Sequence, residues 1–133
     1  MRIMLDTNIL ISIAIFNSEI LKEMLINICE KHTLVLSTQV IKELEEVVKR
    51  KFPNRINNMD KFLYQLPYEL DHISNAIIKN SKIHIRDIKD LPILTSAIES
   101  DVDIFITGDK DFKEVKINKP KIMTAAEFLE KYC

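Results

Sequence analysis

Glycine is almost absent from this sequence. Gly108 is the one glycine among 133 residues. A dinucleotide-binding fingerprint needs several closely spaced glycines, and a phosphate-binding P-loop needs a pair of them, so the sequence excludes both. Chemistry on phosphate groups must therefore rely on another device, and we expect metal ions held by carboxylates.

Cysteine and histidine are also scarce. The two cysteines, Cys29 and Cys133, lie far apart, and the three histidines share no metal-ligand spacing with each other or with a cysteine. The chain therefore has neither a disulfide framework nor a zinc motif. We expect the histidines to be surface or packing residues.

Neither sign of charge dominates, and long apolar runs are missing. The 19 Lys and Arg residues against 20 Asp and Glu residues leave a formal net charge of -1, which excludes a strongly basic nucleic-acid coat but not a local basic patch. The apolar run from Ile9 to Phe16 is too short to span a bilayer. It also lacks the features of a signal peptide, so we expect a cytoplasmic protein without membrane contact.

What the chain does contain is an alternation of strand and helix patterns. Short apolar runs at Ile3–Leu5, Leu34–Leu36 and Ile104–Ile106 predict buried strands, and Lys121–Met123 predicts another. Helices are expected after Asp6, over Glu19–Glu30, Val40–Val48 and Ile56–Leu66, around Ser74–Asn80, from near Asp90, and after a capping box at Thr124 and Glu127. This order predicts one α/β domain over residues 1–133, with a mostly parallel central sheet flanked by helices.

Acidic residues follow the predicted strands. Asp6 ends the first strand, Asp109 ends the Ile104–Ile106 strand with Asp111 close behind, Asp90 begins a helix, and Glu43 lies one turn into another. Ligands of such folds bind beyond the carboxyl ends of the strands, so these acids should converge there. Like charges about 4 Å apart repel by roughly 4 kcal/mol near a protein surface. Divalent cations would relieve this repulsion, and oxygen ligands favour Mg²⁺ or Mn²⁺, which indicates metal-dependent phosphodiester hydrolysis.

Each acid also has an ordinary structural explanation. Asp6 and Asp90 could cap helices, Asp109 and Asp111 could be turn residues, and Glu43 could be solvated like the acids that follow it. Taken singly, these explanations are at least as good as the catalytic one. Taken together, they do not explain why all the acids fall at the same end of the sheet.

Four motifs in order resemble those of PIN-domain ribonucleases, and the resemblance covers nearly the whole chain. They are Leu5–Leu10, Glu43 within Ser37–Leu44, Arg86–Asp90 followed by Pro92–Leu94, and Ile106–Phe112, with a similar tail at Ile122–Leu129. The resemblance implies a parallel sheet flanked by helices and a Mg²⁺ or Mn²⁺ site. It assigns the metal-binding and catalytic acids to Asp6, Glu43, Asp90 and Asp109.

The same resemblance extends to supporting residues and partners. Asn8 and Thr107 would orient carboxylates or a water molecule, and Asp111 would be an additional acid. Relatives often carry a polar or acidic residue after the third acid, whereas this chain has Leu91. Many short members are endoribonuclease toxins of VapBC-type (type II) toxin–antitoxin pairs, which form homodimers and are silenced by a small antitoxin.

Two other functions compete with this interpretation. The chain could be a catalytically weak PIN-fold module that binds RNA or protein, although such a module has no reason to keep a repulsive acid cluster. A nuclease acting on structured DNA is less attractive because long duplexes favour larger basic surfaces. For RNA contact the sequence offers two basic clusters, Lys49–Lys51 with Arg55, and the lysines from Lys110 to Lys121; a solvated surface is the better explanation of the first.

Overall fold

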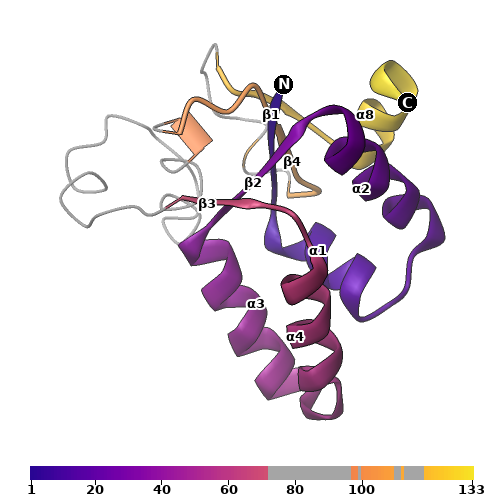
Figure 1. Cartoon of the computed structure of the whole chain (residues 1–133), viewed down its shortest axis with the longest axis vertical. Helices are drawn as coiled ribbons and strands as arrows, with labels where there is room; N and C mark the ends of the chain where they lie inside the picture. Colours follow the sequence, from indigo (N-terminus) through magenta and orange to yellow (C-terminus); the bar gives the residue numbers. More distant parts are fainter. Residues whose placement is uncertain (72–96, 99, 110–111, 113–118) are drawn as a thin grey trace, which may run out of the picture.

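The computed structural model describes residues 1–71, 97–98, 100–109, 112 and 119–133. Its centre is a five-stranded sheet in the order β3-β2-β1-β4-β5, and all paired strands run parallel (Figure 1). The strands are β1 (Arg2–Leu5), β2 (Thr33–Ser37), β3 (Glu69–Asp71), β4 (Ile104–Ile106) and β5 (Lys121–Met123). The α/β class with a parallel central sheet, predicted from the sequence, is confirmed.

The middle of the sheet is fully apolar. Ile3, Met4 and Leu5 of β1 are 0% exposed because β2 and β4 cover both edges of the strand and helices cover the sheet. A parallel strand buried in this way carries a continuous apolar run rather than an alternating pattern. The short apolar runs of the sequence therefore mark the central strands.

Helices follow the strands and shield the sheet. They are α1 (Thr7–Ala14), α2 (Glu19–Lys31), α3 (Thr38–Lys51), the 3-10 turn η1 (Pro53–Arg55), α4 (Ile56–Gln65) and α8 (Ala125–Tyr132). In Figure 1, α3 and α4 lie together below the sheet, whereas α2 and α8 lie together at the upper right. No described helix is long and apolar enough to cross a membrane.

Side-chain caps fix where several helices begin. Ser37 accepts a hydrogen bond from the Val40 amide at 3.0 Å and so starts α3 directly after β2. Thr124 and Glu127 form the capping box expected for the last helix. Since α3 begins where β2 ends, its first turns lie at the carboxyl edge of the sheet.

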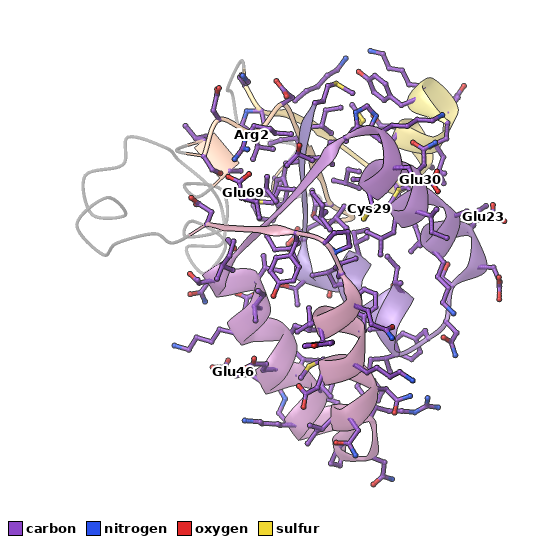
Figure 2. All side chains as sticks on the ribbon, viewed as in Figure 1. Arg2, Glu23, Cys29, Glu30, Glu46 and Glu69 are labelled. Atoms are coloured by element: carbon purple, nitrogen blue, oxygen red, sulfur yellow. The ribbon has the colours of Figure 1, made fainter. Side chains whose placement is uncertain are left out.

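The strand β3 was not predicted. It is a short edge strand whose Glu69 and Leu70 are exposed, so it lacks the apolar run that marks the other strands. Pairing with β2 and two Arg2–Glu69 hydrogen bonds, of 2.9 and 3.0 Å, hold it in the sheet (Figure 2). These are long-range contacts, which a local pattern does not reveal.

Two expected helices fall largely outside the described residues. The helix expected around Ser74–Asn80 lies wholly outside them. Of the helix expected from near Asp90, Ala97 and Ile98 are described, and both are helical.

The strand order determines where a ligand can bind. From β1 the chain builds outward through β2 to β3, and it then returns to the other side of β1 with β4 and β5. The direction of winding thus reverses between β1 and β4. In open α/β sheets the crevice beyond the carboxyl ends of two such strands is the usual binding position.

Candidate active site

Asp6 and Thr107 meet at this reversal point. Leu5 of β1 is in register with Ile106 of β4. The residues that follow these two strands, Asp6 and Thr107, therefore lie side by side. The Asp6 amide donates to the Ile106 carbonyl at 3.0 Å, and the Thr107 hydroxyl donates to Oδ2 of Asp6 at 2.6 Å. The Asp6 carboxylate is therefore fixed by the neighbouring strand.

The other carboxylate oxygen of Asp6 caps α1. Oδ1 accepts a hydrogen bond of 2.8 Å from the Thr7 amide. Asp6 can therefore cap α1, as considered from the sequence, and also belong to a site, because the cap uses only one of its two carboxylate oxygens. Asp6 is only 5% exposed.

Asp109 is tied to the same pair. The Thr107 hydroxyl accepts a hydrogen bond of 3.0 Å from the Asp109 amide while it donates to Asp6. The short turn after β4 is thereby fastened to the start of α1. Thr107 itself is fully buried, at 0% exposed, so its hydroxyl serves only this network.

Glu43 reaches the site from α3. The Thr7 hydroxyl donates to Oε2 of Glu43 at 2.9 Å, across the contact between α1 and α3. Thr7 therefore links two acids, since its amide holds Asp6 and its hydroxyl holds Glu43. Thr7 was not singled out from the sequence; its position between Asp6 and Asn8 was the available signal.

Burial makes ionisation of both carboxyls harder. Desolvation raises the pKa of Asp6, and the hydrogen bonds from Thr107 and Thr7 offset part of this while the nearby Asp109 carboxylate adds to it. Desolvation likewise raises the pKa of Glu43; its bond from Thr7 opposes this rise and the Asp6 charge reinforces it. The site thus holds negative charge at a cost that a bound cation would remove.

These side chains line one pocket. It has a volume of about 180 Å³ and is bounded by Asp6, Thr7, Asn8, Glu43, Glu46, Val47, Arg50 and Asp109. Three of the four acids singled out in the sequence thus face a common space. The remaining one, Asp90, and the additional acid Asp111 lie outside the described residues.

The donor set suits a hard divalent cation. Its carboxylate, amide and hydroxyl oxygens are the ligands that Mg²⁺ and Mn²⁺ prefer, and none of the described lining residues is a histidine or cysteine. Within the described ranges, no group of three acidic, histidine or cysteine side chains is already closed around a metal position. Asp6, Glu43 and Asp109 are therefore candidate ligands that line a common space rather than a finished coordination shell.

Two basic residues of the predicted clusters have distinct positions. Arg50 lines the acid pocket, although its cluster was expected to be plain solvated surface. Lys119 instead pairs with Asp101 and Asp103 at 2.8 and 3.3 Å. Since Asp103 directly precedes β4, this pair lies at the amino edge of the sheet, away from the pocket.

A comparison with protein families identifies the class of protein. A family model described as PIN domain matches residues 2–111, so the chain belongs to the PIN domain family. The resemblance noted from the sequence motifs is thereby confirmed. The matched range includes Asp6, Glu43, Asp90, Asp109 and Asp111. No curated protein sequence matches the chain.

Solved structures share the fold over nearly the whole chain. One is VapBC2 from Rickettsia felis, crystallised with a DNA fragment from its promoter; the TM-score is 0.73 at 21% identity, covering 93% of this chain and 98% of that one. Another is VapC20 from Mycobacterium tuberculosis, a Sarcin-Ricin loop cleaving toxin, with a TM-score of 0.64 at 10% identity, covering 84% and 92%. At these identities the likeness shows the common fold.

Proposed function

We propose that this chain is a metal-dependent endoribonuclease that hydrolyses phosphodiester bonds of RNA. The observation that carries the proposal is the pocket at the carboxyl edge of the sheet, which Asp6, Glu43 and Asp109 line together in a PIN-domain chain. A cluster of carboxylates that repel one another is not needed for the structure, because one acid is enough to cap α1. We take residues 1–133 as one PIN-like nuclease domain.

The proposed roles follow from the hydrogen bonds. Asp6, Glu43 and Asp109, together with Asp90, would bind Mg²⁺ or Mn²⁺. When bound, the cation supplies an activated nucleophile and stabilises negative charge on the phosphate. Thr107 and Thr7 hold the carboxylates of Asp6 and Glu43 in fixed orientations.

Two further residues, Asn8 and Asp111, are proposed to support the site. Asn8 lines the pocket and offers an amide to substrate or water. Asp111 is proposed as an additional acid near Asp109. Asn8 is exposed, so we assign it a positioning role rather than a main binding role.

The wider biological role is proposed from the same fold. The VapC-like architecture suits the toxin of a type II toxin–antitoxin pair. Such a toxin would act in the cytoplasm, form a homodimer and be blocked by a small antitoxin protein. The VapBC2 structure supports the antitoxin partner, since that relative was crystallised as a complex.

The decisive experiment is cleavage of a mixed RNA pool with Mn²⁺ or Mg²⁺, run beside a titration of Mn²⁺ binding. Wild type is compared with Asp6→Asn, with an EDTA control and with Asp60→Asn. Asp60 is an exposed acid on α4, so its variant removes one charge without touching the pocket. We expect cutting by wild type and Asp60→Asn, and none by Asp6→Asn or with EDTA.

The opposite result would support the alternative function, a catalytically weak binding module. A folded wild type that neither cuts RNA nor binds Mn²⁺ would be a PIN-fold module that acts by binding RNA or protein. Cutting that persists with EDTA and in Asp6→Asn would assign the activity to a contaminant or to another site.

A further inference from the structure

Among the described residues that line the acid pocket, one is basic, and it comes from α3. Glu43, Glu46, Val47 and Arg50 of this helix line the pocket. Their spacing of three, four and seven positions places them on one helix face. Lys49 and Lys51, the neighbours of Arg50 in the last turn, do not line the pocket.

The helix geometry explains how Arg50 reaches the rim. Seven residues at 1.5 Å each separate the Cα atoms of Glu43 and Arg50 by about 10 Å along the axis. Helical side chains lean toward the N-terminus of the helix, so the long arginine extends back over the turn that carries Glu46. Figure 2 shows Glu46 projecting from the middle of α3. The guanidinium thus lies at the rim, and Glu43 lies deeper.

No acid of the described chain neutralises this charge directly. Arg50 is exposed and forms no hydrogen bond or ion pair with any described residue. Glu46 lies four positions before it, the order that favours a helical ion pair, yet the two are not paired. The helix dipole favours basic residues at any position in the last turn of a helix. It does not explain why Arg50 lines the acid pocket.

We propose that Arg50 binds a backbone phosphate of the RNA beside the phosphate that is cut. This inference rests on the proposed nuclease function. The planar guanidinium presents a fork of donors that matches two phosphate oxygens, whereas the acids repel the RNA backbone. Its distance from Glu43 along α3 separates it from the reacting group, so Arg50 sets the path of the RNA into the pocket. It is a substrate-binding residue.

The test compares Arg50→Gln with Lys49→Gln. Both changes remove one positive charge from an exposed position in the last turn of α3, so they alter the helix dipole and the net charge alike. Only Arg50 lines the pocket. Steady-state cleavage of a short single-stranded RNA with Mn²⁺ gives kcat and KM, and fluorescence anisotropy with the same RNA gives the Kd.

We expect Arg50→Gln to raise KM and Kd about tenfold, which corresponds to about 1.4 kcal/mol, while kcat stays within about twofold. Lys49→Gln should change each value by less than about twofold. The slope of log Kd against log salt should fall by about 0.7 for Arg50→Gln, as expected for the loss of one phosphate contact to a single strand. Arg50→Lys, which keeps the charge but lacks the fork, should be intermediate.

Equal effects of the two glutamine variants would overturn the inference, because a diffuse charge effect would then suffice. A fall in kcat at unchanged KM would overturn it too. Either result leaves the nuclease proposal standing if wild type cuts RNA. If wild type does not cut, the nuclease proposal fails, and the anisotropy comparison still decides whether Arg50 contacts RNA.

Discussion

Thr107 is hydrogen-bonded to two residues that line the pocket. Its hydroxyl donates to Asp6 and accepts from the Asp109 amide, and it is fully buried between them. A buried hydroxyl that serves a carboxylate and an amide at once cannot be replaced by an apolar side chain without leaving both groups short of a partner. The orientation of Asp6 and the shape of the turn after β4 therefore depend on one oxygen atom.

Replacing Thr107 by valine tests this dependence. Thr107→Val keeps the shape but removes the hydrogen bond that lowers the pKa of Asp6, so that pKa should rise further. We expect the acidic limb of the cleavage pH profile to move to higher pH and the free energy of unfolding to fall by about 1–3 kcal/mol. Measurements are the pH dependence of kcat/KM and urea denaturation. Thr107→Ser keeps the hydroxyl and should retain the wild-type profile; a shift as large as that of valine would contradict this role.

Single residues also show what the sequence can and cannot reveal. Asp6, Glu43 and Asp109 were predicted from their places after strands and in a helix, and the structure brings them to one pocket. Thr7 and Arg50 were not singled out for it, because nothing local distinguishes a bridging threonine or a rim arginine from a cap or a surface charge. Their roles depend on how α1 and α3 pack.

At the scale of elements, α3 connects the sheet with the pocket. It starts at the carboxyl edge of the sheet under the Ser37 cap and carries Glu43 on a face that packs against α1. Val40, Leu44 and Val48 are 0% exposed and form its buried stripe. The placement of Glu43 is therefore set by apolar packing and by the position of the first helical turn.

The caps of α2 and α3 offer a matched comparison. Ser37 is fully buried and accepts from Val40 at 3.0 Å, whereas Ser18 accepts from Leu21 at 3.4 Å in a partly buried position. We expect Ser37→Ala to reduce the free energy of unfolding by about 1–2 kcal/mol and Ser18→Ala by about 0.5 kcal/mol. Urea denaturation of the two variants measures both values. Equal losses would mean that burial adds nothing to the cap of α3.

Secondary structure followed the sequence wherever the pattern was local. The apolar runs of β1, β2 and β4 and the stripes of α2 and α3 predicted those elements closely. The strand β3 escaped prediction since Glu69, Leu70 and Asp71 show no buried pattern, and the strand exists through its pairing with β2 and the bond to Arg2. Such pairing between distant segments forms only when the sheet assembles, so a local sequence pattern does not predict it.

At the scale of the whole molecule, the buried carboxylates of the pocket lower the stability of the metal-free fold at neutral pH. Burial raises the pKa values of both Asp6 and Glu43, so the folded chain takes up protons more readily than the unfolded chain does. Stability from these groups is fully present below their ordinary pKa values and is lost as pH rises through the raised values. Each unit by which the folded value exceeds the unfolded one removes about 1.4 kcal/mol.

Metal-free protein should therefore be less stable at neutral pH than Asp6→Asn. In EDTA at pH 7 we expect the variant to melt at a higher temperature than wild type, and the gap should vanish below pH 3.8, the ordinary value for aspartate. Differential scanning calorimetry across this range measures the gap. Asp60→Asn serves as the control, since that acid is exposed. A gap that does not change with pH would contradict the cost assigned to Asp6.

The pairing of β1 with β4 has a consequence for synthesis of the chain. Asp6 and Thr107 are 101 positions apart, so the earliest acid receives its partner only after most of the chain exists. A nascent polypeptide that ends before β4 carries Asp6 and Glu43 but neither Thr107 nor Asp109. The pocket is therefore complete only after β4 and the turn that follows it have been made, so a shorter nascent chain cannot form the proposed catalytic site.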